Sequence, residues 1–152
     1  MRRRRDAGDG ARRASVLMTM IAVLVLSPLA AAGWTPLPVL RSWTGVVVDD
    51  AALSAVPDGW RVDDAATWDA LWRTWAGGGE PPPAVDFARY TVLVAVALGP
   101  NAVSIQPLRD GNGTVDLGIA ATKIGGPGFG YLLAEVEREG IERVVGGPLL
   151  AR

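Results

Sequence analysis

The sequence contains neither cysteine nor histidine. Without cysteine the chain forms no disulfide and has no thiolate nucleophile, and without either residue it cannot build Cys/His zinc sites or ligate haem through them. A Ser-His-Asp triad is excluded as well, because its general base is missing. Lysine is scarce too, since Lys123 is the only one. These absences remove most familiar reaction centres, and the composition points to no substrate.

What the chain does contain is typical of a folded domain. Apolar residues make up 49% of the 152 residues and charged residues 20%. These proportions exclude a disordered polyelectrolyte and a membrane protein with many spans. The length allows one domain of ordinary size, or one smaller domain that follows an export segment.

Residues 1–32 have the three parts of a secretory signal peptide. Six arginines precede an apolar run at residues 16–26, and three alanines at residues 30–32 supply an A-x-A cleavage pattern before Gly33. We therefore expect an exported protein of the periplasm, the cell envelope or the medium. The alternative is an uncleaved anchor, because residues 14–32 are just long enough to span a bilayer. Only in that case do we expect membrane attachment.

The chain that remains after residue 32 is acidic. It has nine Lys and Arg residues against 14 Asp and Glu residues, a net charge of −5. Such a domain does not attract nucleic acid or anionic lipid, so neither is an expected partner. We expect residues 33–41, which include two prolines, to form an extended tether and residues 42–152 to form a single α+β domain.

The clearest element is an amphipathic helix over residues 64–76. Its apolar stripe, at positions i, i+3, i+4 and i+7, consists of Trp68, Leu71, Trp72 and Trp75. Asp63 or Asp64 can cap its start, and the glycines and prolines of residues 77–83 end it. The spacing favours a structural role in the core. The alternative is an exposed tryptophan platform that binds a glycan or another small ligand.

Strands account for most of the remaining pattern. The expected strands are residues 42–48, 90–98, 102–106, 114–121, 131–138 and 141–145. The run at 90–98 is continuously apolar, as in a central strand covered on both faces, and residues 110–113 form a hairpin turn. Residues 131–138 contain helix formers, but we interpret them as a strand. The expected fold class is α+β, an antiparallel sheet of about five strands with one Trp-rich amphipathic helix packed on it.

Asp86 is the carboxylate that stands out. It lies between a Pro-rich loop and the apolar run, flanked by Val85 and Phe87. A carboxylate in that position normally caps backbone N–H groups or pairs with a nearby arginine such as Arg89. We therefore favour a structural role. The alternative is a carboxylate-dependent hydrolase in which Asp86 works with a second carboxyl group.

A glycine-rich loop occupies residues 123–130. Its glycines match neither G-x-G-x-x-G nor the P-loop spacing, so we expect no nucleotide. We assign no catalytic residue, no metal site and no cofactor. The loop is instead a candidate contact surface for a partner protein, as is the strand edge near Trp43. The candidate contact residues in the loop are Lys123, Gly125, Gly126, Phe129 and Tyr131.

The order of these features resembles the C-terminal domain of the protease complex subunit PrcB family. The similarity spans about residues 60–150 and rests on the aromatic helix, on Val85-Asp86-Phe87 before a buried strand, and on a loose match to a Gly-Gly-Tyr pattern at residues 128–131. The resemblance implies an exported, non-enzymatic accessory domain that assists or stabilises a partner, in the type case a surface protease. The family usually carries a lipoprotein anchor, whereas this chain has no cysteine to be lipidated.

Overall fold

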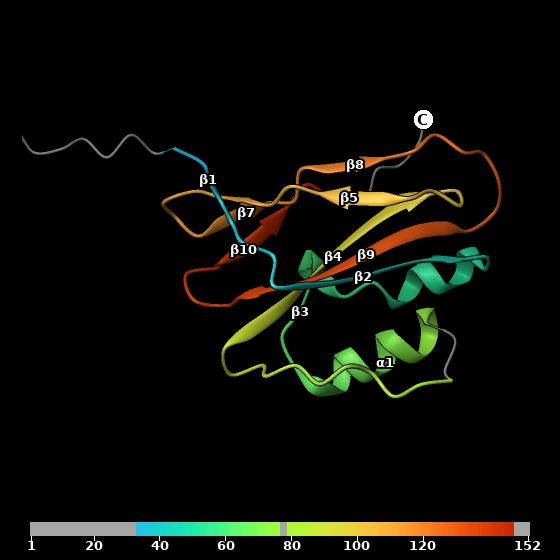
Figure 1. Cartoon of the computed structure of the whole chain (residues 1–152), viewed down its shortest axis with the longest axis horizontal. Coiled ribbons are helices and arrows are strands. Elements are labelled where there is room, and N and C mark those ends of the chain that lie inside the picture. The colour runs from blue at the N-terminus through green and yellow to red at the C-terminus, as the bar shows by residue number, and fades with distance from the viewer. Residues whose placement is uncertain (1–32, 77–78, 148–152) are drawn as a thin grey trace, which may run out of the picture.

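A computed structural model describes residues 33–76 and 79–147 of the chain (Figure 1). The expected signal peptide at residues 1–32 lies outside the described residues. Within them, no helix is both long and apolar enough to cross a membrane. The described part is mixed α+β, with one α-helix and mostly antiparallel sheets. The expected class is therefore confirmed, but the strands form three sheets of two to four strands instead of one sheet of five.

The elements follow one another from β1 near the N-terminus to β10. The strands are β1 (Thr35–Pro36), β2 (Arg41–Val47), β3 (Arg61–Val62), β4 (Tyr90–Leu98), β5 (Val103–Ile105), β6 (Leu108–Arg109), β7 (Thr114–Asp116), β8 (Ile119–Ala121), β9 (Phe129–Glu137) and β10 (Arg143–Val145). The α-helix is α1 (Ala65–Trp75), and two 3₁₀ helices, η1 (Asp50–Ala55) and η2 (Asp58–Trp60), precede it. Residues 131–138 lie largely in β9, so their interpretation as a strand is correct.

The central layer is a four-stranded antiparallel sheet in the order β2-β9-β4-β3. Its two long strands, β4 and β9, pair along their whole length, from Tyr90 opposite Glu137 to Leu98 opposite Phe129. Both strands are almost entirely buried. Their apolar residues do not alternate with polar ones because other elements cover both faces of the sheet (Figure 1).

Helix α1 covers one face of this sheet. Trp68, Leu71 and Trp75 are 3%, 1% and 5% exposed and pack against β4 and β9. The side chain of Asp64 accepts a hydrogen bond from the backbone N–H of Thr67 at 2.9 Å, which caps the helix start. The helix therefore begins and ends where its apolar stripe and its capping residue predict.

The tryptophan side chains also connect α1 to loops on either side. The indole N–H of Trp68 donates to the carbonyl oxygen of Pro83 at 2.8 Å. That of Trp75 donates to the carbonyl oxygen of Ala52 in η1 at 2.9 Å. A buried indole needs such an acceptor, because an unpaired N–H in the core is costly. The helix thus holds η1 and the Pro-rich loop in place.

The opposite face is covered by the expected hairpin, which the structure shows to be divided. Strands β5 and β8 pair in one small sheet, and β6 and β7 pair in another, with β10 parallel to β7. The pairing has the same register in both parts: Ile105 is opposite Ile119, and Leu108 is opposite Asp116. Between them, Pro107 has no N–H to donate, and Gly118 has a φ of +53°. This interruption explains why the expected hairpin falls into two small sheets.

Residues 33–41 are extended, as their prolines indicate, but they are bound to the domain and do not hang free as a tether. Strand β1 pairs with β6. Leu37 is 7% exposed, and its N–H donates to the carbonyl oxygen of Pro107 at 2.9 Å. The N–H of Leu40 donates to the backbone carbonyl oxygen of Glu135 at 2.9 Å. The segment therefore contacts both the divided hairpin and the central sheet.

Candidate functional site

Strand β2 is the outermost strand of the central sheet. It pairs with β9 on one side and with no strand of residues 33–76 or 79–147 on the other. An edge strand presents a row of unpaired backbone N–H and C=O groups, which proteins usually protect with lysine, proline or a bulge. The sequence of β2, RSWTGVV, has no lysine and no proline, and its pairing with β9 is regular over seven residues. Its single charged side chain, Arg41, is ion-paired with Glu135 of β9.

The two faces of β2 have different surroundings. Trp43 and Val47 point towards α1 and join its hydrophobic cluster. Alternation along the strand turns the intervening side chains to the other face. There the exposed side chains are Ser42, Thr44 and Val46 in β2 and Val48 just after it. The cluster between the central sheet and the divided hairpin includes residues of β4 and β9 but none of β2. This face of β2 is therefore uncovered.

The glycine-rich loop lies beside the end of β2 and is anchored by one side chain. The amide oxygen of Asn101 accepts the N–H of Ile124 at 2.7 Å and the hydroxyl of Thr122 at 2.9 Å, and its NH₂ group donates to the Ile124 carbonyl oxygen at 3.2 Å. At the other end of the loop, the N–H of Gly128 donates to a carboxylate oxygen of Asp50 at 2.8 Å. The loop therefore has a defined conformation.

The anchored loop and the open face of β2 meet at Gly130. Val46 is opposite Gly130 in the register, and a side chain on Gly130 would collide with the Asn101 carbonyl oxygen. Asn101 in turn holds Ile124. Val46 and Ile124 are 48% and 53% exposed. We call the exposed side chains of Ser42, Thr44, Val46 and Val48, together with loop residues 123–127, the β2 edge surface.

The structure separates the candidate loop residues into two groups. Lys123, Gly125 and Gly126 are exposed in the β2 edge surface. Phe129 and Tyr131 belong to β9, are 0% and 5% exposed, and pack against Trp75 at ring-centroid distances of 5.3 and 5.2 Å. Assigning them to a contact surface was wrong, because β9 starts directly after Gly128.

The buried ring of Tyr131 nevertheless contacts the edge strand, at Gly45 of β2. A side chain on Gly45 would collide with the ring of Tyr131, whose hydroxyl oxygen lies 2.5 Å from the position of the added carbon. The ring therefore occupies the space that a larger residue at this point of β2 would fill. Burial raises the pKa of the Tyr131 hydroxyl above 10.0, so it stays protonated at neutral pH.

The tryptophans of α1 form a cluster in the core. Trp43 of β2 lies 5.3 Å from Trp68 and 6.1 Å from Trp72 between ring centroids. Trp43 and Trp72 are half-buried, and Trp68 and Trp75 are buried. A glycan platform needs rings whose faces are open to a sugar, and Trp68 and Trp75 offer none because they are buried. The cluster instead supports β2 on the side that faces α1.

Asp86 caps a turn. Its carboxylate accepts the N–H of Ala88 at 3.1 Å, and its carbonyl oxygen accepts the N–H groups of Arg89 and Tyr90 at 3.0 and 2.9 Å. These bonds direct the chain from the Pro-rich loop into β4. The geometry is that of a structural carboxylate.

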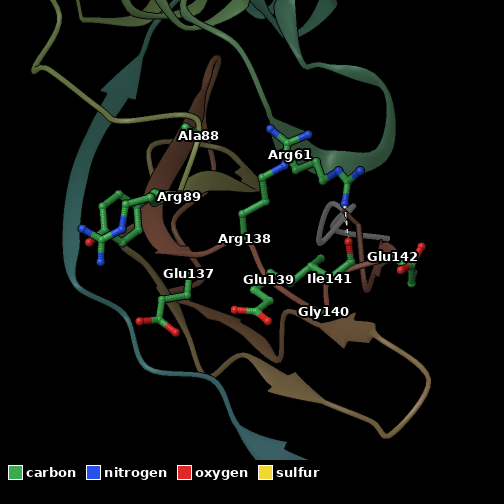
Figure 2. Close-up of a pocket in the computed structure, with 10 residues that line it drawn as sticks. Arg61, Ala88, Arg89, Glu137, Arg138, Glu139, Gly140, Ile141 and Glu142 are labelled. Carbon is green, nitrogen blue, oxygen red and sulfur yellow. Dashed lines mark hydrogen bonds between the residues drawn. The ribbon is translucent and has the colours of Figure 1, made fainter.

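A pocket of about 570 Å³ lies at the end of β9 that is farther from the glycine-rich loop (Figure 2). The charged residues that line it are Arg61, Arg89, Arg138, Glu137, Glu139 and Glu142. Arg61 donates to the carbonyl oxygen of Ile141 at 3.1 Å and Arg138 to that of Phe87 at 3.0 Å. Figure 2 shows Glu137 and Glu139 on the side away from these guanidinium groups. The two arginines thus connect chain segments, and the pocket lining mixes both signs of charge.

No protein-family model matches the chain, and no curated protein or solved structure matches it. The similarity to the PrcB family therefore stays a prediction from short motifs. The geometry of the chain itself, above all the β2 edge surface, is what bears on its function.

Sequence reasoning named the strand edge near Trp43 as a candidate contact surface, and β2 is an edge strand. It did not name the exposed apolar residues Val46, Val48 and Ile124. These residues are recognisably apolar in the sequence. No sequence pattern shows, however, that the divided hairpin covers β4 and β9 and leaves β2 uncovered. The signal available from sequence was the absence of lysine and proline in residues 42–48, which is unusual for an exposed edge strand.

Proposed function

We propose that this chain is an exported, non-enzymatic accessory domain that binds and stabilises a partner protein. The resemblance to the PrcB family favours an exported partner such as a secreted protease. The single observation that supports binding is the β2 edge surface, an edge strand with one uncovered face and an anchored loop beside it. Export rests on the sequence of residues 1–32.

An extended segment of the partner would bind by adding a strand to β2. Such strand addition gains affinity from backbone hydrogen bonds and specificity from the pockets that receive alternate side chains. On one face of the added strand, side chains would meet Val46 and Ile124, which are about half exposed. On the other face they would meet the half-buried rings of Trp43 and Trp72. The surface therefore suits a segment with apolar side chains towards Trp43 and Trp72, and with both polar and apolar side chains on the face of Ser42, Thr44 and Val46.

The anchored loop makes this binding less costly. Ordering a loop during association reduces affinity, so a loop already held in place favours binding. Asn101 provides that restraint through both polar atoms of its side chain while it is only 5% exposed. The backbone of Ile124 is thereby held at a fixed position.

Site-specific crosslinking tests this function. A photo-crosslinking amino acid replaces Val46 in the full chain, which is expressed in the cells that make it. A second variant carries the same group at Ala120, an exposed residue of β8. We expect irradiation to join the first variant, but not the second, to an exported protein that mass spectrometry identifies. An adduct pattern equal at both positions, or no foreign protein at position 46, would contradict the proposal.

A further inference from the structure

We propose that cleavage after Ala32 creates an α-ammonium group at Gly33 that binds in an acidic pocket of the domain itself. This inference rests on the export that the proposed function includes, because it requires removal of the expected signal peptide. Before cleavage, the Gly33 nitrogen belongs to a neutral peptide bond and carries no charge. Cleavage therefore adds one positive charge at this point of the fold.

The pocket has a volume of about 480 Å³, and Gly33 itself is one of the residues that line it. Its charged groups are three carboxylates and one guanidinium group, a net charge of −2, from Asp110, Glu137, Glu139 and Arg109. A space of this volume is about 10 Å across, which is about one Debye length at about 0.1 M salt. Salt therefore does not fully screen these carboxylates from a charge at Gly33.

Glu137 and Glu139 are the carboxylates available to the ammonium group. Both are exposed, and neither forms an ion pair within the part of the chain that the structure describes. Figure 2 shows both side chains on the side away from the guanidinium groups of Arg61 and Arg138. An added cation in this pocket would therefore meet two carboxylates that no arginine neutralises.

The other two charged groups of the pocket already have partners. The carboxylate of Asp110 accepts the backbone N–H groups of Asn112 and Thr114 at 2.9 and 2.8 Å. The guanidinium group of Arg109 donates to the backbone carbonyl oxygen of Glu139 at 2.7 Å. It forms no ion pair with a carboxylate of the described residues. The two glutamates therefore remain as the partners of an ammonium group.

Strand pairing holds Gly33 beside this pocket. Thr35 of β1 is opposite Arg109 of β6, and its hydroxyl donates to the Arg109 carbonyl oxygen at 3.1 Å. Only Trp34 separates this paired residue from Gly33. A terminus that is fixed so close to its end loses little further freedom when it forms an ion pair. Because residues 33–41 contact both the divided hairpin and the central sheet, the ion pair would stabilise the connection between these layers.

Titration of the terminal amine tests the inference. Lys123→Arg removes the only lysine, so the α-amine becomes the only primary amine of a processed chain. The full chain with this change is expressed in the cells that make it and is purified after processing. The rate at which an acylating reagent modifies the amine is then measured against pH. We expect the pKa of the Gly33 amine to lie above the ordinary α-amino range of about 7.7–8.0, because nearby carboxylates favour the charged form.

Substitution of the carboxylates gives the matched comparison. In the Glu137→Gln, Glu139→Gln double variant, we expect the pKa of the Gly33 amine to return to the ordinary range. Glu80→Gln, the same change at an exposed residue of the Pro-rich loop, should leave that pKa raised.

Chemical modification of the amine separates its charge from its position. Reductive methylation keeps the positive charge, whereas acetylation removes it. A group whose pKa is raised in the folded state stabilises that state fully below its unfolded pKa, so the two forms are compared at about pH 6. We expect the acetylated chain to unfold at a lower urea concentration than the methylated chain. The difference should disappear in the Glu137→Gln, Glu139→Gln double variant.

An amine pKa within the ordinary range, or one that the two glutamate substitutions leave unchanged, would overturn the inference. Equal stability of the acetylated and methylated chains would do so too. The mass of the purified chain and the crosslinking at Val46 separate this inference from the proposed function. An exported chain that begins at a residue other than Gly33 but crosslinks to a foreign protein refutes ammonium binding only. A chain that binds its ammonium group but crosslinks to no foreign protein refutes the partner only, and a chain that is not exported refutes both.

Discussion

Asn101 shows how a single buried side chain defines an exposed surface. It is 5% exposed, and its amide group bonds the backbone of Ile124 through both of its polar atoms. The hydroxyl of Thr122 donates to the same amide oxygen. Only an amide supplies an acceptor and a donor at these positions together. Asn101 is therefore the residue on which the shape of the loop depends.

Replacing Asn101 with alanine tests this dependence. We expect Asn101→Ala to lower the free energy of unfolding by about 1–3 kcal/mol, because the Ile124 N–H and its carbonyl oxygen lose their partners. Urea unfolding measures the loss, and the Ile124 amide should exchange its hydrogen faster. Asn112→Ala, a matched change in an exposed turn, should change stability by less than about 0.5 kcal/mol. Equal losses in the two variants would contradict the anchoring role.

For single residues, the sequence predicted which side chains are structural better than it predicted which side chains are exposed for contact. The stripe Trp68, Leu71 and Trp75 occupies the core because its spacing of three and four residues fixes one helix face. Phe129 was misplaced because the neighbouring glycines indicated a loop, whereas the pairing with β4 extends the strand to that residue. Exposure of Val46 depends on what lies above β2, and this is set by distant parts of the chain.

Two of the structural elements depend on ionised carboxylates at their ends. Hydrogen bonds from the backbone N–H and the hydroxyl of Thr67 lower the pKa of Asp64 below 3.8 at the start of α1. The backbone N–H of Thr114 is the main cause of a similarly lowered pKa for Asp110 in the turn before β7. A carboxyl group with a lower pKa in the folded state stabilises that state when it is ionised. The stabilisation is complete above the unfolded pKa and is lost as the pH falls through the folded pKa.

Substitution with asparagine tests this pH dependence, because an amide keeps the shape of the side chain but does not titrate. We expect the Asp64→Asn, Asp110→Asn double variant to lose less stability than the unmodified chain as the pH falls below 3.8. Urea unfolding across that range measures the difference. Asp58→Asn, at an exposed residue of η2, is the comparison. If all three chains lost stability in parallel, these two carboxylates would not carry the effect.

The elements themselves were largely predictable, and their association was not. The apolar run at residues 90–98 coincides with β4, because a strand buried on both faces needs apolar residues throughout. The hairpin was predicted as one unit, but Pro107 and Gly118 interrupt its ladder at nearly the same level. The parallel pairing of β10 with β7 joins segments with no local pattern in common. Such contacts come from packing over long sequence distances.

At the scale of the whole described part, residues 33–76 and 79–147, a central sheet lies between α1 and the divided hairpin (Figure 1). Residues 33–41 run across this arrangement and contact two of its parts. Strand β1 extends the sheet of the hairpin by pairing with β6, and Leu40 bonds Glu135 in β9. Leu37 lies between these contacts, in the hydrophobic cluster that joins the hairpin to the central sheet. A segment that looks like a linker in the sequence thus helps to hold the layers together.

Truncation of Leu37 distinguishes such an integral segment from a tether. We expect Leu37→Ala to lower the free energy of unfolding by about 2–5 kcal/mol, because it leaves a cavity between the hairpin and the central sheet. Val39→Ala, two residues later in the same segment and 40% exposed, should cost less than about 0.5 kcal/mol. Urea unfolding of both variants gives the comparison. If Leu37→Ala were as harmless as Val39→Ala, the segment would contribute no packing, and the domain would begin at β2. A large loss at Leu37 alone would instead mean that the folded unit begins close to residue 33, next to the expected cleavage site.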